Sequence, residues 1–157
     1  MPTSSASSRD IDRVASALVV SLPALHRALE RQVEQEFPHP RLPEGRLALL
    51  WLVEEREGIT VREAADALLM KPNNVSALVS QLTELELLER RQDPADKRVA
   101  YLHPTATAWQ RLAEVRRLKT AYVARALHAL TDGERDALGS ALGALMSLSR
   151  HLPPTAG

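Results

Sequence analysis

The sequence ITVREAADALLMKPNNVSALVSQLTELELLERRQDPADKRVAYL, residues 59–102, determines the fold that we expect for this chain. Its first part, Thr60-Val61-Arg62-Glu63, matches a capping box, in which the Thr60 hydroxyl accepts from the Glu63 amide and the Glu63 carboxylate accepts from the Thr60 amide. A short helix follows, and Pro72 suits the first turn of a second helix. The second helix has one apolar stripe, formed by Val75, Leu78, Val79, Leu82 and Leu85.

The stretch after Leu85 changes to two β-like runs, residues 87–92 and 98–102, on either side of a charged turn. Asp93 followed by Pro94 is typical of a type I turn, because the Asp side chain accepts from the backbone ahead and proline presets the dihedral angle. Two short helices followed by a charged hairpin are the order of a winged helix-turn-helix, whose second helix enters the major groove of DNA.

The flanking segments have helical spacing of apolar residues and carry more apolar surface than one small winged domain can cover. Residues 11–37 are expected as one bent helix or two short ones, because Pro23 interrupts them. Pro43 suits the start of a buried helix, and Thr131 and Glu134 form a second capping box. We expect a mainly α fold with a small β-hairpin wing: residues 11–157 form one domain, in which 43–103 are the winged helix-turn-helix and 11–37 and 104–152 are dimerisation helices of a homodimer.

Three segments resemble the MarR family of winged helix-turn-helix transcriptional regulators. Residues 59–68 (ITVREAADAL) look like the first motif helix, residues 75–90 like the recognition helix running into the wing, and Asp93-Pro94-Ala95-Asp96-Lys97-Arg98 like the wing signature Asp-Pro-x-Asp-x-Arg. The match is good from about Leu42 to Pro104. The family usually has a small hydroxyl residue, a threonine and a glycine where this chain has Lys71, His103 and Ala106, and the first departure weakens a helix cap.

Helical geometry predicts which side chains face DNA. Asn73, Ala77, Ser80 and Glu84 lie opposite the apolar stripe, and Asn74, Ser76 and Gln81 lie on its flanks. Asn and Gln can bind adenine through two hydrogen bonds and an alanine methyl can touch thymine, so this face suits A·T-containing sites. An ordinary solvated helix face is the alternative interpretation.

The wing carries most of the basic residues that we expect to contact DNA. The resemblance implies that Arg98 reaches the minor groove while Asp96 holds it in place, and a local ion pair that stiffens the hairpin is compatible with this role. Arg90, Arg91, Lys97 and Lys71 are the expected phosphate contacts. We therefore expect a homodimeric repressor that binds double-stranded DNA at an inverted repeat.

The resemblance also implies a small aromatic or phenolic effector, bound between the dimerisation helices and the winged part. Candidate lining residues are His26, Trp51, Trp109 and Tyr122, for which core packing is the alternative interpretation.

Composition excludes several other functions. The chain has no cysteine, which rules out disulfides and thiol chemistry, and its five scattered histidines offer no metal-binding spacing. No catalytic motif is present, so we expect no enzyme activity and no cofactor. Residues 1–10 are polar and Ser-rich, which predicts a disordered arm instead of a signal peptide, and hence a cytoplasmic protein without membrane association.

Net charge is formally zero, with 20 basic and 20 acidic residues. A DNA-binding protein often carries a basic excess, although phosphate affinity depends on local clusters. A winged helix that binds another protein is therefore the alternative function.

Overall fold

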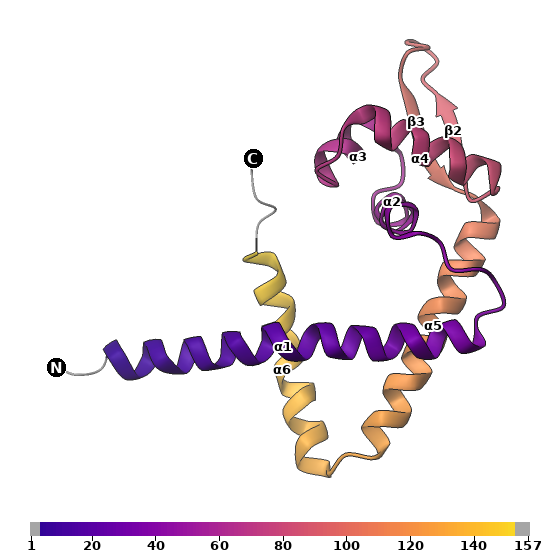
Figure 1. The fold of residues 1–157 in the computed structure, drawn as a ribbon. Helices are drawn as coiled ribbons and strands as arrows, with labels where there is room; N and C mark the ends of the chain where they lie inside the picture. Colours follow the sequence, from indigo (N-terminus) through magenta and orange to yellow (C-terminus); the bar gives the residue numbers. More distant parts are fainter. Residues whose placement is uncertain (1–3, 153–157) are drawn as a thin grey trace.

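A computed structural model describes residues 4–152 of the chain. Six helices and three strands follow one another in these residues (Figure 1): α1 (Ser4–Glu36), α2 (Glu44–Glu55), β1 (Ile59–Thr60), α3 (Val61–Ala67), α4 (Pro72–Glu84), β2 (Leu88–Gln92), β3 (Ala100–Pro104), α5 (Ala106–His128) and α6 (Asp132–Arg150). This confirms the expected fold class, a mainly α chain with a β-hairpin wing in a winged helix-turn-helix.

The hydrophobic core lies where α2, α3 and α4 meet the small sheet and the start of α5. Its largest fully buried side chains come from α2, from α4, and from β2 and β3, together with Leu87, which directly precedes β2. They are Leu49, Leu50, Val53, Val75, Val79, Leu82, Leu87, Leu88 and Leu102. The expected stripe on α4 therefore faces the core, except at its end, where Leu85 remains 42% exposed.

The helices α3 and α6 begin where their capping-box sequences predict. Both predicted capping boxes are present, at Thr60 with Glu63 and at Thr131 with Glu134. The pKa of both glutamate carboxylates is lowered. The main cause is a hydrogen bond from the backbone amide of the capping threonine, and the second is a hydrogen bond from the hydroxyl of the same threonine. A third cap was not predicted: the Thr105 hydroxyl accepts from the Ala108 amide and also donates to the Glu86 carbonyl, which ties α5 to the wing.

The sheet has one strand more than the sequence predicts. β1 pairs antiparallel with β3, and β3 pairs antiparallel with β2, so that β3 is central. β1 was missed because its two residues are too few to show alternation. The second wing strand also begins two residues later than expected, at Ala100, and continues to Pro104. Arg98 is consequently part of the turn.

Asp93 organises that turn. Its Oδ1 accepts from the amides of Ala95 and Asp96 at 2.7 and 3.0 Å, and its Oδ2 accepts from the Tyr101 hydroxyl at 2.8 Å. The Tyr101 hydroxyl and then these amides hold the pKa of Asp93 below its usual value, and the carboxylate in turn raises the pKa of Tyr101. The wing tip is therefore held by an ionised carboxylate.

The N-terminal region is one helix, which is one of the two expected alternatives, but this helix begins earlier than expected. α1 is one continuous helix through Pro23, which lacks the N–H that would donate to the Val19 carbonyl. It begins at Ser4, so residues 4–10, expected as a disordered arm, are helical. Residues 1–3 of that expected arm lie outside the described part of the chain.

The outer helices leave apolar side chains uncovered. In Figure 1, α5 runs from the wing to α1, α6 doubles back after the end of α5, and α1 extends away from the winged part, to which a linker joins it at α2. Val19 and Val20 on α1 are each 72% exposed, and α6 has no buried residue. On α6 the exposed large side chains Leu138, Leu142 and Met146 recur every four residues, which places them on one face.

We predict that Tyr101→Phe raises the pKa of Asp93 and lowers the free energy of unfolding at neutral pH. A carboxyl group whose pKa is lowered in the folded state contributes stability above its unfolded pKa and loses it as pH falls through the folded pKa. The difference in stability between wild type and variant should therefore shrink in acid. Carboxyl NMR titration and urea unfolding at several pH values measure the two effects, and an unchanged Asp93 pKa would contradict this role of Tyr101.

Candidate functional site

α4 presents a polar face to solvent because its apolar face is required by the core. Val75, Val79 and Leu82 are fully buried, and the residues on the opposite side are exposed: Asn73, Ala77, Ser80 and Glu84. Asn74 is also exposed, whereas Ser76 and Gln81 are half-buried at the two edges of the face. The side chains predicted from helical geometry therefore share one surface, and that surface carries no lysine or arginine.

Two arginines from other elements lie at the edges of this surface. Arg90 of β2 lies beside one edge, with its Nη2 3.4 Å from the Ser76 carbonyl oxygen and 3.5 Å from Ser80 Oγ. Arg46 of α2 lies at the other edge, where its Nε donates to Gln81 Oε1 at 2.7 Å. Arg90 was among the predicted residues; Arg46 was not, because its partner is 35 positions away in the sequence.

The start of α4 is also open. Lys71 is the N-cap residue, is exposed, and makes no side-chain capping bond, as expected for a lysine at this position. Its ammonium group therefore adds a positive charge beside Asn73 and Asn74, at the end of the helix where backbone N–H groups point outward.

The wing tip places its cations in solvent. The side chain of Arg98 is 92% exposed, with its Nε 3.3 Å from Asp96 Oδ1, which also accepts from the Arg98 amide at 3.0 Å. Lys97 beside it is exposed. Arg91 instead pairs with Glu89 on the same strand at 2.5 Å, which offsets part of its charge. Asp96 therefore orients Arg98 without burying it.

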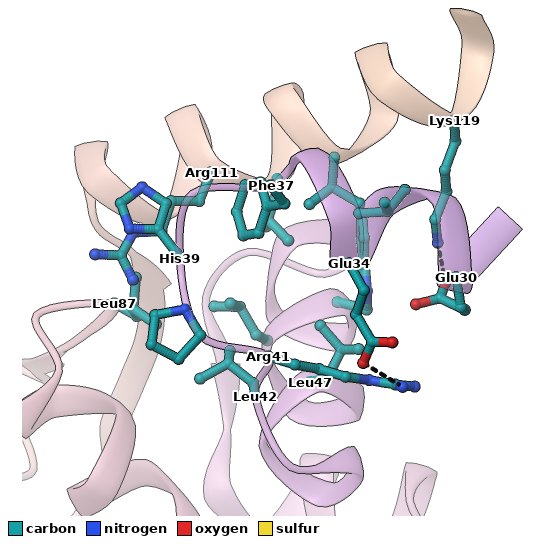
Figure 2. Close-up of a pocket in the computed structure, with 16 residues that line it drawn as sticks. Glu30, Glu34, Phe37, His39, Arg41, Leu42, Leu47, Leu87, Arg111 and Lys119 are labelled. Carbon is teal, nitrogen blue, oxygen red and sulfur yellow. Dashed lines mark hydrogen bonds and ion pairs between the residues drawn. The ribbon is translucent and has the colours of Figure 1, made fainter. Parts of the chain in front are cut away.

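A cavity of about 310 Å³ lies on the other side of α2, between this helix, the C-terminal end of α1, the linker after it and α5 (Figure 2). Its apolar walls include Val33, Leu50, Trp51, Leu112 and Val115. Two ion pairs stand at its margin, Glu34 with Arg41 at 3.0 Å and Glu30 with Lys119. The cavity lies between the outer helices and the winged part, where an effector cleft was expected.

Arg111 of α5 also lines this cavity and was not predicted. Its Nε is buried and has no hydrogen-bond partner in the described part of the chain. A guanidinium N–H left without an acceptor in a confined site favours an incoming anion. No sequence signal marks this arginine, because its position on α5 resembles that of other basic residues along the helix.

The expected effector residues are not all brought together. Trp51 lines the cavity, and Arg116 lies over its ring at 5.6 Å. His26, Trp109 and Tyr122 are not in the wall: His26 is exposed beside Glu30, Trp109 is 40% exposed, and Tyr122 contacts Arg125 through its ring. A hydrogen bond with Glu36 raises the pKa of Tyr122.

Residues 4–152 contain neither a cluster of metal-binding side chains nor a membrane-spanning helix. No group of three or more histidine, aspartate and glutamate side chains is placed to hold a metal ion there. None of the helices in that range is both long and apolar enough to span a membrane.

Comparison with known proteins agrees with this geometry. The MarR family model matches residues 42–99, which include α2, the helix-turn-helix and the wing tip. The HTH-type transcriptional regulator YkoM of Bacillus subtilis (strain 168) is 27% identical over 143 residues, 91% of this chain and 92% of that protein. The HTH-type transcriptional repressor MdtR of the same organism is 25% identical over 126 residues, 80% of this chain and 81% of that protein.

Solved structures share the fold across most of the chain. A putative transcriptional regulator from Pseudomonas aeruginosa PA01 superposes with a TM-score of 0.76 at 24% identity, covering 90% of this chain and 96% of that one. Streptococcus pneumoniae FabT, solved in complex with DNA, superposes with a TM-score of 0.66 at 16% identity, covering 91% and 99%. With its motif helices, its wing signature and its flanking helices in this order, the chain carries a MarR-type winged helix-turn-helix at residues 42–99 and is similar to HTH-type transcriptional regulators along most of its length.

Proposed function

We propose that the protein is a sequence-specific DNA-binding repressor that acts as a homodimer on an inverted-repeat operator and is released by a small aromatic or phenolic acid. The observation that carries this proposal is that the polar, solvent-facing surface of α4 occurs together with the solvent-exposed Arg98 at the wing tip. These two elements could enter adjacent major and minor grooves.

Basic residues cluster around the α4 surface, although the net charge of the whole chain is zero. Lys71, Arg90, Lys97 and Arg98 all lie at the edges of the α4 surface or on the adjoining wing and are exposed. Counterion release depends on the number of phosphates contacted locally, so acidic residues elsewhere do not cancel it. The naming of the relative MdtR as a repressor supports the direction of regulation.

Dimerisation is supported by the exposed apolar faces of α1 and α6. The 19-residue helix α6 exposes a row of apolar side chains, Leu138, Leu142 and Met146, to water. A second copy of the chain would bury this row in a dimer interface. Two-fold symmetry would then space the recognition helices by about 34–36 Å, one turn of duplex, and would require an inverted repeat.

The cavity beside Trp51 supports the effector. Its carboxylates Glu30 and Glu34 are already paired with cations, whereas the Nε of Arg111 has no acceptor among the described residues. An aromatic acid could fill the apolar walls and give its carboxylate to Arg111. Release from DNA requires that the acid prefer a dimer whose recognition helices are wrongly spaced, because equal affinity for both forms shifts nothing.

We predict that Leu142→Glu shifts the protein from dimer to monomer at micromolar concentration, because it places a charge in the apolar row of α6. Ser140→Glu is the matched control, since it adds the same charge on the opposite face of that helix. Sedimentation equilibrium measures both variants. A wild-type protein that sediments as a stable monomer would overturn the dimer.

We predict that Arg98→Ala weakens binding to every duplex by about 1–3 kcal/mol, whereas Asn73→Ala mainly relaxes the preference among sites. Fluorescence anisotropy with a duplex selected from a random library, and with mismatched versions of it, measures both effects. Arg117→Ala is the control, because this arginine pairs with Glu114 on α5.

The salt dependence of that binding separates the two candidate functions. Affinity for DNA should fall steeply as salt rises, whereas a protein-binding winged helix of this composition should show little change. Equal, sequence-independent losses from Arg98→Ala and Asn73→Ala would contradict base recognition by α4.

We predict that salicylate lowers DNA affinity and that Arg111→Met weakens this response by roughly 10- to 100-fold in salicylate concentration, the range for a charged hydrogen bond. Because the Nε is unsatisfied in the folded protein, the variant should keep its melting temperature or gain slightly. Arg125→Met, outside the cavity wall, is the control. If no acid in a broad aromatic panel changes either DNA affinity or melting temperature, the effector proposal fails.

A further inference from the structure

Gln81 differs from the other amides of the α4 surface because one of its two functional groups is already occupied. The Nε of Arg46 donates to Gln81 Oε1 at 2.7 Å in a half-buried contact. The side chains of Asn73 and Asn74 are exposed and make no hydrogen bond within residues 8–152.

The hydrogen bond from Arg46 fixes the orientation of the Gln81 amide group. A guanidinium group has only donors, so the Gln81 carbonyl oxygen must face Arg46 and the NH2 group must point away from it. A glutamine that binds adenine uses both its groups, since the carbonyl accepts from N6 and the NH2 donates to N7. Gln81 held in this way directs its NH2 group away from Arg46, and a cation already engages one of the two lone pairs of its carbonyl oxygen.

The packing of α2 keeps Arg46 at this position. The first turn of α2 lies against α4, where a Cβ added at Gly45 would come within 3.6 Å of Leu78 Cδ1. Leu49 and Leu50, one turn further along α2, are fully buried in the core. The backbone that carries Arg46 is therefore anchored, and the guanidinium group reaches Gln81 from a fixed direction.

We propose that Arg46 is a positioning residue that determines sequence specificity: it turns the Gln81 NH2 group outward and competes for the Gln81 carbonyl oxygen, so that Gln81 prefers a base edge with acceptors. Guanine, through N7 and O6, and thymine, through O4, present acceptors and no donor in the major groove, whereas the N6 donor of adenine would compete with Arg46 for the carbonyl oxygen. The inference rests on the proposed DNA binding. It differs from the expectation that Gln81 binds adenine as an unconstrained glutamine would.

The position of Gln81 on α4 indicates that its target is a base and not a phosphate. Gln81 lies on the same flank of α4 as Asn74, two turns further along, at an edge of the surface that the resemblance assigns to the major groove, where the neighbouring cation, Arg46, is half-buried. The cations that suit phosphate, Lys71 and Arg90, lie at the start and the opposite edge of that surface.

Selection of binding sites from a random duplex library tests the proposal with the full-length protein. Wild type should select guanine or thymine at one position in each half-site. Gln81→Met should lose the preference there, and Arg46→Met should replace it by adenine, with discrimination of roughly tenfold in affinity. Arg46→Lys is the conservative control, because its ammonium group also only donates and should retain the wild-type preference. Melting temperatures verify that each variant is folded.

Two outcomes would overturn the proposal while leaving DNA binding intact. One is a uniform loss of affinity in Arg46→Met and Gln81→Met with no altered base preference, which would indicate a phosphate contact. The other is an unchanged selection in Arg46→Met. Failure of the wild type to enrich any sequence would instead overturn the proposed function, and this inference with it.

NMR of the free protein provides a test that needs no DNA. If the pair is formed, the Arg46 Nε–H should exchange with water at least several-fold more slowly than that of the exposed Arg62, and Gln81→Met should abolish the difference. Equal exchange at Arg46 and Arg62 would overturn the proposal directly.

Discussion

The complete burial of one face of α4 is the constraint on which the rest of the structure depends. Val75, Val79 and Leu82 have no exposed surface, and they pack with Leu49 and Val53 of α2 in the same core. Rotating the helix would expose these side chains at a cost of about 1.5–3 kcal/mol each. The core therefore decides which side chains of α4 face solvent, and hence which ones would face DNA in the proposed complex.

The positive charges of the candidate DNA-binding surface come mostly from outside α4. Arg90 arrives from β2, Arg46 from α2 and Arg98 from the turn that Asp93 organises. This arrangement separates two tasks, since α4 can keep short polar groups suited to base edges while the neighbouring elements supply the cations. It also explains how a chain with equal numbers of acidic and basic residues can present a locally basic surface.

The same α2 helix connects the candidate DNA-binding surface to the cavity. Its first turn holds Arg46 against α4, and further along it places Leu47, Leu50 and Trp51 in the cavity wall. Arg116 of α5 pairs with Glu54 at 2.8 Å, so α2 is also joined to the long helix that carries Arg111. A ligand that moved α5 relative to α1 would therefore act on the helix that positions α4. In the effector proposal, α2 is the physical link between the two sites.

The sequence by itself determined the fold class, both capping boxes, the turn at Asp93 and the polar face of α4, because these features depend on residues that lie close together in the sequence. It did not determine β1, whose pairing with β3 is a contact between distant residues, nor the helical state of residues 4–10. Tertiary structure alone decided that Trp51 lines the cavity while Trp109 and Tyr122 do not, and that Arg111 is left without an acceptor in the described chain. It also decided that Arg46 occupies the carbonyl of Gln81. These features require side chains from separate helices to meet at a given distance, which periodicity within one helix cannot specify.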